Sequence, residues 1–241
     1  MTDNLTQRER VIQRAAEMFA ELGVKSIRMD DIAKDMAMSK RTLYELFADK
    51  SELLYHSVKY MQATEQRRLV KKINLDDGGI PALLEMFFAM IENSRRFRRF
   101  NENLGKFYPE VFKRVVTESR DQGLSRLREV LNRFISKGLI SPTVNVDLSI
   151  TMFYYTAMGL VRRQGQLSLP AGVSEEMAFG YTVVNFFRGI ATVEGVQQID
   201  RWIATQPPLG GYAVQSAWDS VPRRYGTRKR RLLSMRFFSV P

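Results

Sequence analysis

The stretch of residues 27–54 limits the fold more than any other part of this chain. It reads IRMDDIAKDMAMSKRTLYELFADKSELL, and it contains three short helical patterns with almost nothing between them. Ser39 precedes the second pattern as a good N-cap, and Asp49 precedes the third, with Glu52 three residues later in a variant of the capping box. Two short helices joined by a turn of three or four residues form a helix-turn-helix, whose second helix enters the major groove of DNA.

Apolar residues recur at helical spacing within these patterns, and they define the expected core of a small head. They share the inner faces of the first two patterns: Met29, Ile32, Ala33 and Met36, then Leu43, Leu46 and Phe47. Upstream, residues 7–22 show the same spacing after a capping box at Thr6 and Glu9, and Gly23 suits the end of that helix. The sequence therefore predicts a three-helix head with a helix-turn-helix.

This head resembles the DNA-binding domain of the TetR (tetracycline-repressor-like) family of bacterial transcription regulators. The resemblance covers about the first quarter of the chain, and its motifs are specific: Ala15-Ala16, Phe19, Gly23, Asp31-Ile32-Ala33, Ser39-Lys40-Arg41-Thr42-Leu43-Tyr44, Phe47, Asp49-Lys50 and Glu52-Leu53-Leu54. One departure is Ala37, because the family usually has glycine in the turn. If that position is left-handed, alanine costs about 1 kcal/mol relative to glycine.

The formal net charge of +11 suggests an anionic partner, but its distribution matters more than its size. Residues 1–50 hold nine Lys and Arg against nine Asp and Glu, so the predicted head is neutral overall. Residues 51–221 hold 21 basic and 17 acidic residues, and residues 222–241 hold seven basic residues and no acidic one. The excess lies mostly in the C-terminal tail, so the prediction of DNA binding depends on the motif.

Beyond the head, the chain shows helical patterns and no strand pattern of notable length. A long helix is expected from Lys50 to about Lys72, and another begins near Pro81 and ends in the arginine-rich run at residues 95–99. Those arginines are expected to stabilise the end of that helix through its dipole; the alternative is a site for an acidic ligand. Further helices are expected at residues 109–117, 124–135, 146–161, 175–193 and 196–204.

These patterns predict an all-α fold in three parts. Residues 1–50 form the helix-turn-helix domain, residues 51–204 form a larger helical body for ligand binding and dimerisation, and residues 205–241 form a basic, flexible tail. The prolines and glycines of the tail break any regular element. The tail is either a solvated extension or a second, sequence-independent contact with phosphates. A membrane-surface contact through its apolar residues is the weakest alternative.

Several classes of function are disfavoured by residues that the chain lacks. It has no cysteine and one histidine, so disulfides, thiol chemistry and a zinc site are not expected. No catalytic motif or phosphate-cradling glycine loop is found, so we expect neither an enzyme nor a bound cofactor. No run of 18 apolar residues and no signal peptide is found, and we expect a cytoplasmic protein without membrane contacts.

The resemblance and the docking geometry of the motif nominate six residues as DNA contacts: Lys40, Arg41, Thr42, Tyr44, Glu45 and Lys50. Lys40 and Arg41 can donate to guanine or phosphate, and Thr42 can meet a thymine methyl group. Tyr44 resembles the tyrosine with which the family touches the DNA backbone. Lys50 lies in the first turn of the next helix, where its charge and the free amides suit a phosphate.

The resemblance also implies a homodimer that binds a palindromic operator, and a small-molecule effector that weakens DNA binding. The output is expected to be repression. Residues that could line the pocket, each also suited to plain core, are Phe87, Phe88, Phe112, Phe134, Met152 and Tyr155. The apolar helices 146–161 and 174–193 are the expected dimer interface. Their aromatic residues, such as Tyr155, Phe186 and Phe187, are expected to be interface or core. The alternative is a regulator without a small ligand, whose body is a scaffold for protein interactions.

Overall fold

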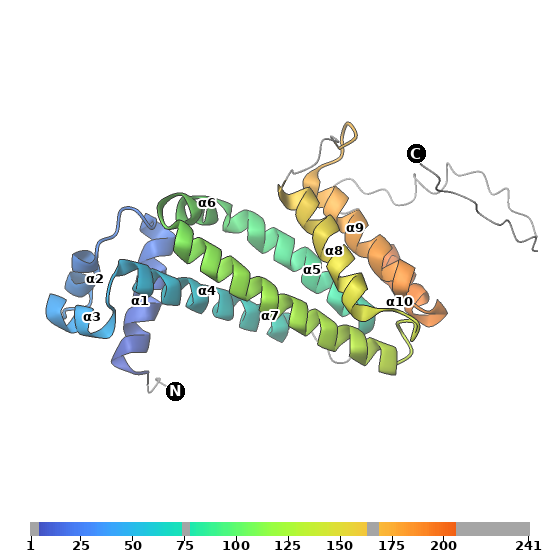
Figure 1. Ribbon diagram of the computed structural model, residues 1–241, viewed down its shortest axis with the longest axis horizontal. Coiled ribbons are helices and arrows are strands. Elements are labelled where there is room, and N and C mark those ends of the chain that lie inside the picture. The colour runs from blue at the N-terminus through green and yellow to red at the C-terminus, as the bar shows by residue number, and fades with distance from the viewer. Residues whose placement is uncertain (1–4, 74–77, 163–168, 206–241) are drawn as a thin grey trace, which may run out of the picture. The chain divides into compact units, whose positions relative to one another are not determined.

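A computed structural model describes residues 5–73, 78–162 and 169–205. Within these ranges the chain forms ten α-helices and no β-strand, with one isolated bridge between Ile140 and Ala191 (Figure 1). The prediction of an all-α fold is confirmed. The predicted basic tail lies outside the described residues. None of the described helices is long and apolar enough to cross a membrane.

The first four helices are α1 (Gln7–Leu22), α2 (Met29–Asp35), α3 (Lys40–Leu46) and α4 (Lys50–Lys72). The capping box of α1 is complete. The Glu9 amide donates to the Thr6 hydroxyl at 3.2 Å, and the Thr6 amide donates to the Glu9 carboxylate at 2.8 Å. This reciprocal pair satisfies two amides that the first helical turn would leave without partners.

Six further helices form the body: α5 (Gly79–Arg96), α6 (Arg98–Phe107), α7 (Pro109–Ser136), α8 (Val146–Arg162), α9 (Glu175–Ile190) and α10 (Val193–Thr205). Helix α8 packs along α9 and also touches α7, while α5 packs against α9 and α10 (Figure 1). Polar side chains cap both α8 and α9 at their first turns. Asn145 accepts from the Leu148 amide at 3.0 Å, and Ser174 accepts from the Met177 amide at 3.2 Å.

Helix α7 corrects the expectation of two helices at residues 109–117 and 124–135. The structure has one helix of 28 residues through this region. Gly123 lies within it on the exposed side, where a Cβ would meet nothing within 4 Å. A glycine inside an exposed helix costs about 1 kcal/mol relative to alanine. Burial of Val115 before it and Leu127 after it, among others, outweighs that penalty.

Helix α6 was not predicted, because the arginine-rich run reads as the end of a helix. The structure interrupts the helix only at Phe97, and a new helix begins at Arg98. The dipole interpretation therefore holds for Arg96 at the end of α5 but is wrong for Arg98 and Arg99 at the start of α6. Ion pairs compensate two of these charges: Arg96 lies 3.7 Å from Glu65, and Arg98 lies 4.0 Å from a carboxylate one turn later in α6.

The boundary between α9 and α10 lies three residues earlier than expected. Helix α9 ends at Ile190 and α10 begins at Val193, where the sequence suggested 193 and 196. The reason is Thr192, whose hydroxyl accepts from the Gly195 amide at 3.2 Å. A threonine in this place starts a helix by satisfying one of its first amides.

The apolar core of the head extends beyond residue 50. Leu104 of α6 and Val111 and Val115 of α7 are buried in the same cluster as Phe19 and Leu43. The junction of α6 and α7, which we call the elbow (residues 104–115), is therefore part of the head's packing. A movement of the elbow would act directly on the helices that hold the helix-turn-helix.

Candidate nucleic-acid interface

The turn between α2 and α3 has a left-handed residue at Ala37, with φ of 50°. This conformation lets the Met38 amide donate to the Ala33 carbonyl at 2.9 Å, which closes the end of α2. Alanine at this position carries a penalty of about 1 kcal/mol relative to glycine. The turn thus has the geometry that the motif requires, in spite of the residue that departs from the family pattern.

Helix α3 is fixed on its inner side. The Ser39 hydroxyl accepts from the Thr42 amide at 3.0 Å, which confirms the predicted N-cap. Leu43 and Phe47 are fully buried in the core of the head, as expected, and Leu46 is half-buried. Only the outer side of this short helix is therefore available to a partner.

The outer side of α3 presents Arg41, Tyr44 and Glu45. The side chain of Arg41 is 89% exposed, and its Nε donates to the Glu45 carboxylate at 2.9 Å. An exposed ion pair one helical turn apart is worth only about 0.3–0.5 kcal/mol. Arg41 can therefore exchange Glu45 for a base edge or a phosphate at little cost.

Lys40 and Thr42 each have a polar partner within the motif. Lys40 forms an ion pair with Asp30 of α2, and this hydrogen bond raises the pKa of Lys40. Thr42 is half-buried, and its hydroxyl lies 2.8 Å from that of Ser39. No local pattern signals the Lys40–Asp30 contact, because its partners are ten residues apart across the turn.

Lys50 has a partner inside the protein. Its ammonium donates to the Val24 carbonyl at 2.6 Å and lies 5.8 Å from the ring centroid of Phe19 and 5.2 Å from that of Tyr108. Tyr108 belongs to the elbow, so Lys50 connects the start of α4 with the α1–α2 loop and with the body. The predicted phosphate contact of Lys50 remains a prediction, and it competes with these internal contacts.

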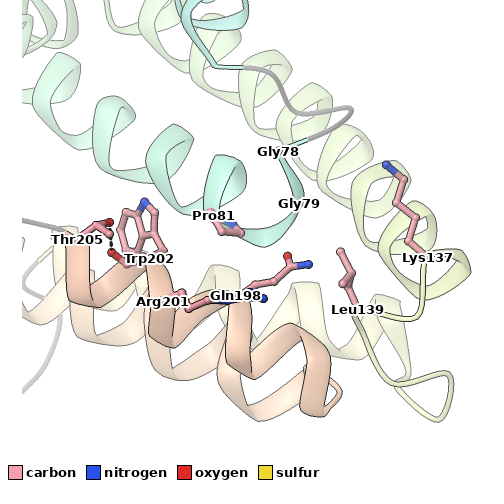
Figure 2. Close-up of a pocket in the computed structure, with 9 residues that line it drawn as sticks. All are labelled: Gly78, Gly79, Pro81, Lys137, Leu139, Gln198, Arg201, Trp202 and Thr205. Carbon is pink, nitrogen blue, oxygen red and sulfur yellow. Dashed lines mark hydrogen bonds between the residues drawn. The ribbon is translucent and has the colours of Figure 1, made fainter.

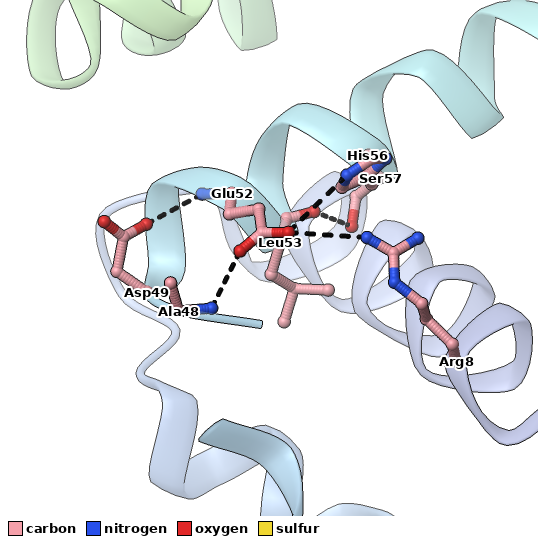
Figure 3. Close-up of polar contacts among 7 residues, drawn as sticks. All are labelled: Arg8, Ala48, Asp49, Glu52, Leu53, His56 and Ser57. Carbon is pink, nitrogen blue, oxygen red and sulfur yellow. Dashed lines mark hydrogen bonds and ion pairs between the residues drawn. The ribbon is translucent and has the colours of Figure 1, made fainter. Parts of the chain in front are cut away.

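Glu52 organises the start of α4, as Figure 3 shows. Its amide donates to Asp49 at 2.8 Å, and its carboxylate accepts from the Ala48 amide at 2.7 Å. The carboxylate thus reaches one residue beyond the N-cap, whereas in the standard capping box it would accept from the amide of the N-cap residue itself. Glu52 also lies 3.5 Å from Arg8 and 3.9 Å from His56. It therefore links the turn after α3 to α1.

The six residues nominated for a ligand pocket do not come together. Phe134 is fully buried, Phe112 packs against Gly105 beside the head's core, and Phe87 lies against Phe153 and Phe187. Phe88 instead stacks on Trp202 at 5.7 Å. Met152 and Tyr155 are 60% and 71% exposed on α8, so they do not line an enclosed cavity.

The two residues nominated for the dimer interface also differ from each other. Phe187 is 0% exposed within the single chain and contacts Phe87 and Phe153, so it belongs to the body's own core. Of the two expected roles, interface or core, Phe187 therefore has the second within the single chain. Phe186 is half-buried, and its role at an interface remains a prediction.

Comparison with known proteins finds the same domain in the head. Residues 11–56 match the sequence profile of the family described as "Bacterial regulatory proteins, tetR family". An HTH-type transcriptional regulator of Staphylococcus aureus strain USA300 is 39% identical over 56 residues, which is 23% of this chain and 30% of that protein. The chain thus matches less than a third of the length of this relative.

Solved structures show the same fold over a longer part of the chain. A TetR-family regulator from Marinobacter aquaeolei has a TM-score of 0.50 and 20% identity, covering 84% of this chain and all of that one. A transcriptional regulator from Cytophaga hutchinsonii has a TM-score of 0.57 and 18% identity, covering 76% and 98%. At these identities the likeness concerns the fold.

The motif, its buried anchors and its exposed outer side define a helix-turn-helix domain of the class that transcription regulators carry. More narrowly, residues 11–56 match the DNA-binding domain of the TetR family, and the chain shares its helical fold with a solved TetR-family regulator. The resemblance first seen in residues 27–54 is confirmed.

Proposed function

We propose that this protein is a repressor that binds a palindromic DNA operator as a homodimer and releases it when a small molecule binds. The observation that carries the DNA-binding part is α3. Its inner side is anchored by Leu43 and Phe47, while Arg41 and Tyr44 face outward near its N-terminal end. In this docking mode, the N-terminal residues of the second helix contact base edges in the major groove.

We propose that Lys40, Arg41, Thr42, Tyr44 and Glu45 form the contact surface with DNA. Arg41 suits a bidentate contact with guanine, and Glu45 can accept from the amino group of cytosine. Tyr44 and Thr42 suit the sugar-phosphate backbone, which positions the helix without reading sequence. Lys40 stays paired with Asp30 in the free protein. On DNA, the ammonium of Lys40 exchanges the Asp30 carboxylate for a phosphate, whose stronger negative field favours that exchange.

A homodimer is supported by the outer face of α8. Leu148, Met152 and Tyr155 lie along one side of this helix and are 56%, 60% and 71% exposed. Three large apolar side chains in a row form a patch that a second copy would cover. Two heads related by a two-fold axis would then read two half-sites about 34–36 Å apart.

A small-molecule effector is supported by the resemblance and by the elbow. Because Leu104, Val111 and Val115 pack in the head's core, a ligand that shifts α6 or α7 would shift the head. The coupling is reciprocal, so DNA would weaken the ligand by the same factor. The alternative is a regulator with no small ligand, whose α8 face binds a different protein.

The deciding experiment is selection of DNA that the full chain binds from a random pool, followed by footprinting of the selected site. The proposal expects an inverted repeat with half-site centres one helical turn apart, and one dimer per site by sedimentation. Selection of no preferred sequence, or of a single unrepeated half-site, contradicts it. Loss of DNA binding with any of a panel of small molecules then separates the effector model from the protein scaffold.

A further inference from the structure

A cleft lies at the end of the body where α5 begins, and no DNA contact or predicted pocket residue belongs to it. Its walls are the start of α5, the turn between α7 and α8, and the side of α10 that faces α5 (Figure 2). Its volume of about 560 Å³ falls within the range of small-molecule sites. The cleft is therefore large enough for a ligand of ten or more heavy atoms.

One wall of this cleft is rigid. The Thr192 hydroxyl donates to the Gly138 carbonyl at 2.7 Å, and the Thr192 amide donates to the Leu139 carbonyl at 3.0 Å. Gly195 then lies so close to the α7–α8 turn that a Cβ would come within 2.2 Å of the Leu139 carbonyl oxygen. The start of α10 is thus held against the α7–α8 turn, and the cleft is already formed before any ligand binds.

The chemistry of the lining favours an anion with an apolar part. Pro81, Leu139 and Trp202 supply apolar surface, and Trp202 is held by a 3.3 Å hydrogen bond from its indole to Glu85. Arg201 and Lys137 also line the cleft, and none of the lining residues that the structure describes is acidic (Figure 2). These two side chains give the described lining its positive charge.

Arg201 has N–H donors beyond those that its contacts within the protein use. It lies 3.6 Å from Glu194, and its Nε donates to a backbone carbonyl of its own helix at 3.3 Å. A guanidinium has five N–H donors, so these two contacts leave others for a carboxylate. Gln198 lies between α10 and Gly79 and adds an amide that can donate or accept (Figure 2).

We propose that this cleft binds a small organic anion, with its carboxylate or sulfonate at Arg201 and Lys137 and its apolar body against Trp202. The cleft also touches both helices that lead to the elbow, because α5 begins here and α7 ends here. An effector role for this anion rests on the proposed function as a regulator. Binding itself does not, and the two are measured separately.

The test uses the full chain and two probes that differ only in charge, 4-phenylbutyrate and the uncharged 4-phenylbutyramide. Calorimetry gives the affinity without DNA. The variants are Arg201→Gln and Lys137→Gln, and the matched control is Arg128→Gln, an exposed arginine paired with Asp147 on another part of the body. Since Trp202 and Trp218 are the chain's two tryptophans, a Trp218→Phe background makes Trp202 the sole reporter of the cleft.

We expect one phenylbutyrate per chain, binding at least about tenfold more tightly than the amide, because a hydrogen bond to a charged group is worth 1.5 kcal/mol or more. Each cleft variant should weaken binding by a similar factor, the control should not, and Trp202 emission should change on binding. The site is overturned if no binding is measured at millimolar concentration. It is also overturned if binding has the same affinity in both variants and leaves Trp202 emission unchanged. If phenylbutyrate binds but operator affinity stays constant, the effector role falls while the repressor assignment stands.

Discussion

At the scale of single residues, Arg41 is the side chain on which base recognition most depends. We expect Arg41→Ala to lose about 1–3 kcal/mol of operator affinity per half-site, because a bidentate base contact is removed. The fold should be unchanged, since Arg41 is exposed and its pair with Glu45 is weak. Arg98→Ala is a matched control, because Arg98 is also exposed and also pairs with a glutamate one turn later.

The measurement is a binding titration on the selected operator, with circular dichroism to check folding. Arg41→Ala should lose preference for the operator over random DNA, and Arg98→Ala should keep it. If Arg41→Ala bound the operator as tightly as the unchanged chain, Arg41 would be ordinary surface.

Lys50 is a residue whose two possible roles make opposite predictions. As a phosphate contact, its loss would lower the slope of log affinity against log salt by about one per site. Its internal hydrogen bond to Val24 and its place beside Phe19 and Tyr108 favour the other outcome. We expect Lys50→Ala to leave the salt slope unchanged and to lower the free energy of unfolding by about 1–2 kcal/mol. A lower slope with unchanged stability would restore the phosphate role.

His56 gives the head a pH-dependent stability. Burial lowers its pKa most, and the positive charge of Arg8 lowers it further. Glu52 raises the pKa by less than Arg8 lowers it, and Arg114 adds a smaller lowering. Because the folded state disfavours the charged form, the unfolded chain takes up its proton first as pH falls. Stability is therefore full above the unfolded pKa of about 6.5 and declines from there down to the folded pKa. The melting temperature should fall between pH 7.5 and 5.5 (about one unit either side of that value), and His56→Gln should reduce the fall. An equal fall in both proteins would assign it to other groups.

At the scale of helices, prediction from the sequence succeeded where a cap or a buried stripe is local and failed where packing decides. Thr6, Ser39 and Asp49 cap their helices as expected, since a cap needs only its own first turn. Gly123 reads as a break, but distant burial carries α7 through it. The end of α5 was misplaced for a similar reason, because the interruption at Phe97 spans a single residue.

The candidate sites follow the same division. The exposed side of α3 could be predicted because the motif fixes which side of the helix is buried, and contact of that side with DNA stays a prediction. Met152 and Phe187 could not be placed, because an apolar residue on an apolar helix fits a pocket, a core or an interface equally well. The structure separates them: Phe187 is core, and Met152 is surface. The cleft beside Trp202 had no local signal, since three segments distant in the sequence form it.

The exposed face of α8 predicts where dimerisation can be broken. Met152→Arg or Tyr155→Arg would place a charge in the proposed interface, where an unpaired buried charge costs several kcal/mol. We expect a folded monomer by sedimentation, with little affinity for the palindromic operator. Val70→Arg on α4 is the control, because Val70 is also half exposed and apolar but belongs to another helix. Dimers of normal strength in both α8 variants would place the interface elsewhere.

At the scale of the whole molecule, the elbow of the body is buried in the core of the head, so the head should not unfold independently of the elbow. The elbow residues Leu104, Val111 and Val115 are buried against the head. Tyr55 of α4 also donates to Glu118 of α7 at 2.7 Å, and Lys59 lies 3.3 Å from the same carboxylate. A ligand signal that reaches the elbow therefore has both an apolar and a polar route to α4, the helix that follows the DNA-reading motif.

Charge is the other property of the whole molecule, and its positive excess lies in the C-terminal tail and not in the DNA-binding head. Residues 1–50 have equal numbers of acidic and basic residues, while residues 222–241 hold seven basic residues and no acidic one. A neutral head binds through a few well-placed cations, but it should attract DNA weakly from a distance. The tail can supply that attraction, because cations gain from counterion release without a fixed geometry.

A chain that ends at Val221 tests this role for the tail. We expect slower association and weaker binding to operator and random DNA alike at low salt, with unchanged preference between them. The difference should shrink as salt rises, since charges farther apart than about 8–10 Å are screened near physiological ionic strength. A full-length control with the seven tail cations changed to glutamine separates charge from length. If the shortened and full chains bound both DNAs equally well at low salt, the tail would have no part in DNA binding. If the glutamine chain behaved like the unchanged protein, its charge would not be the cause.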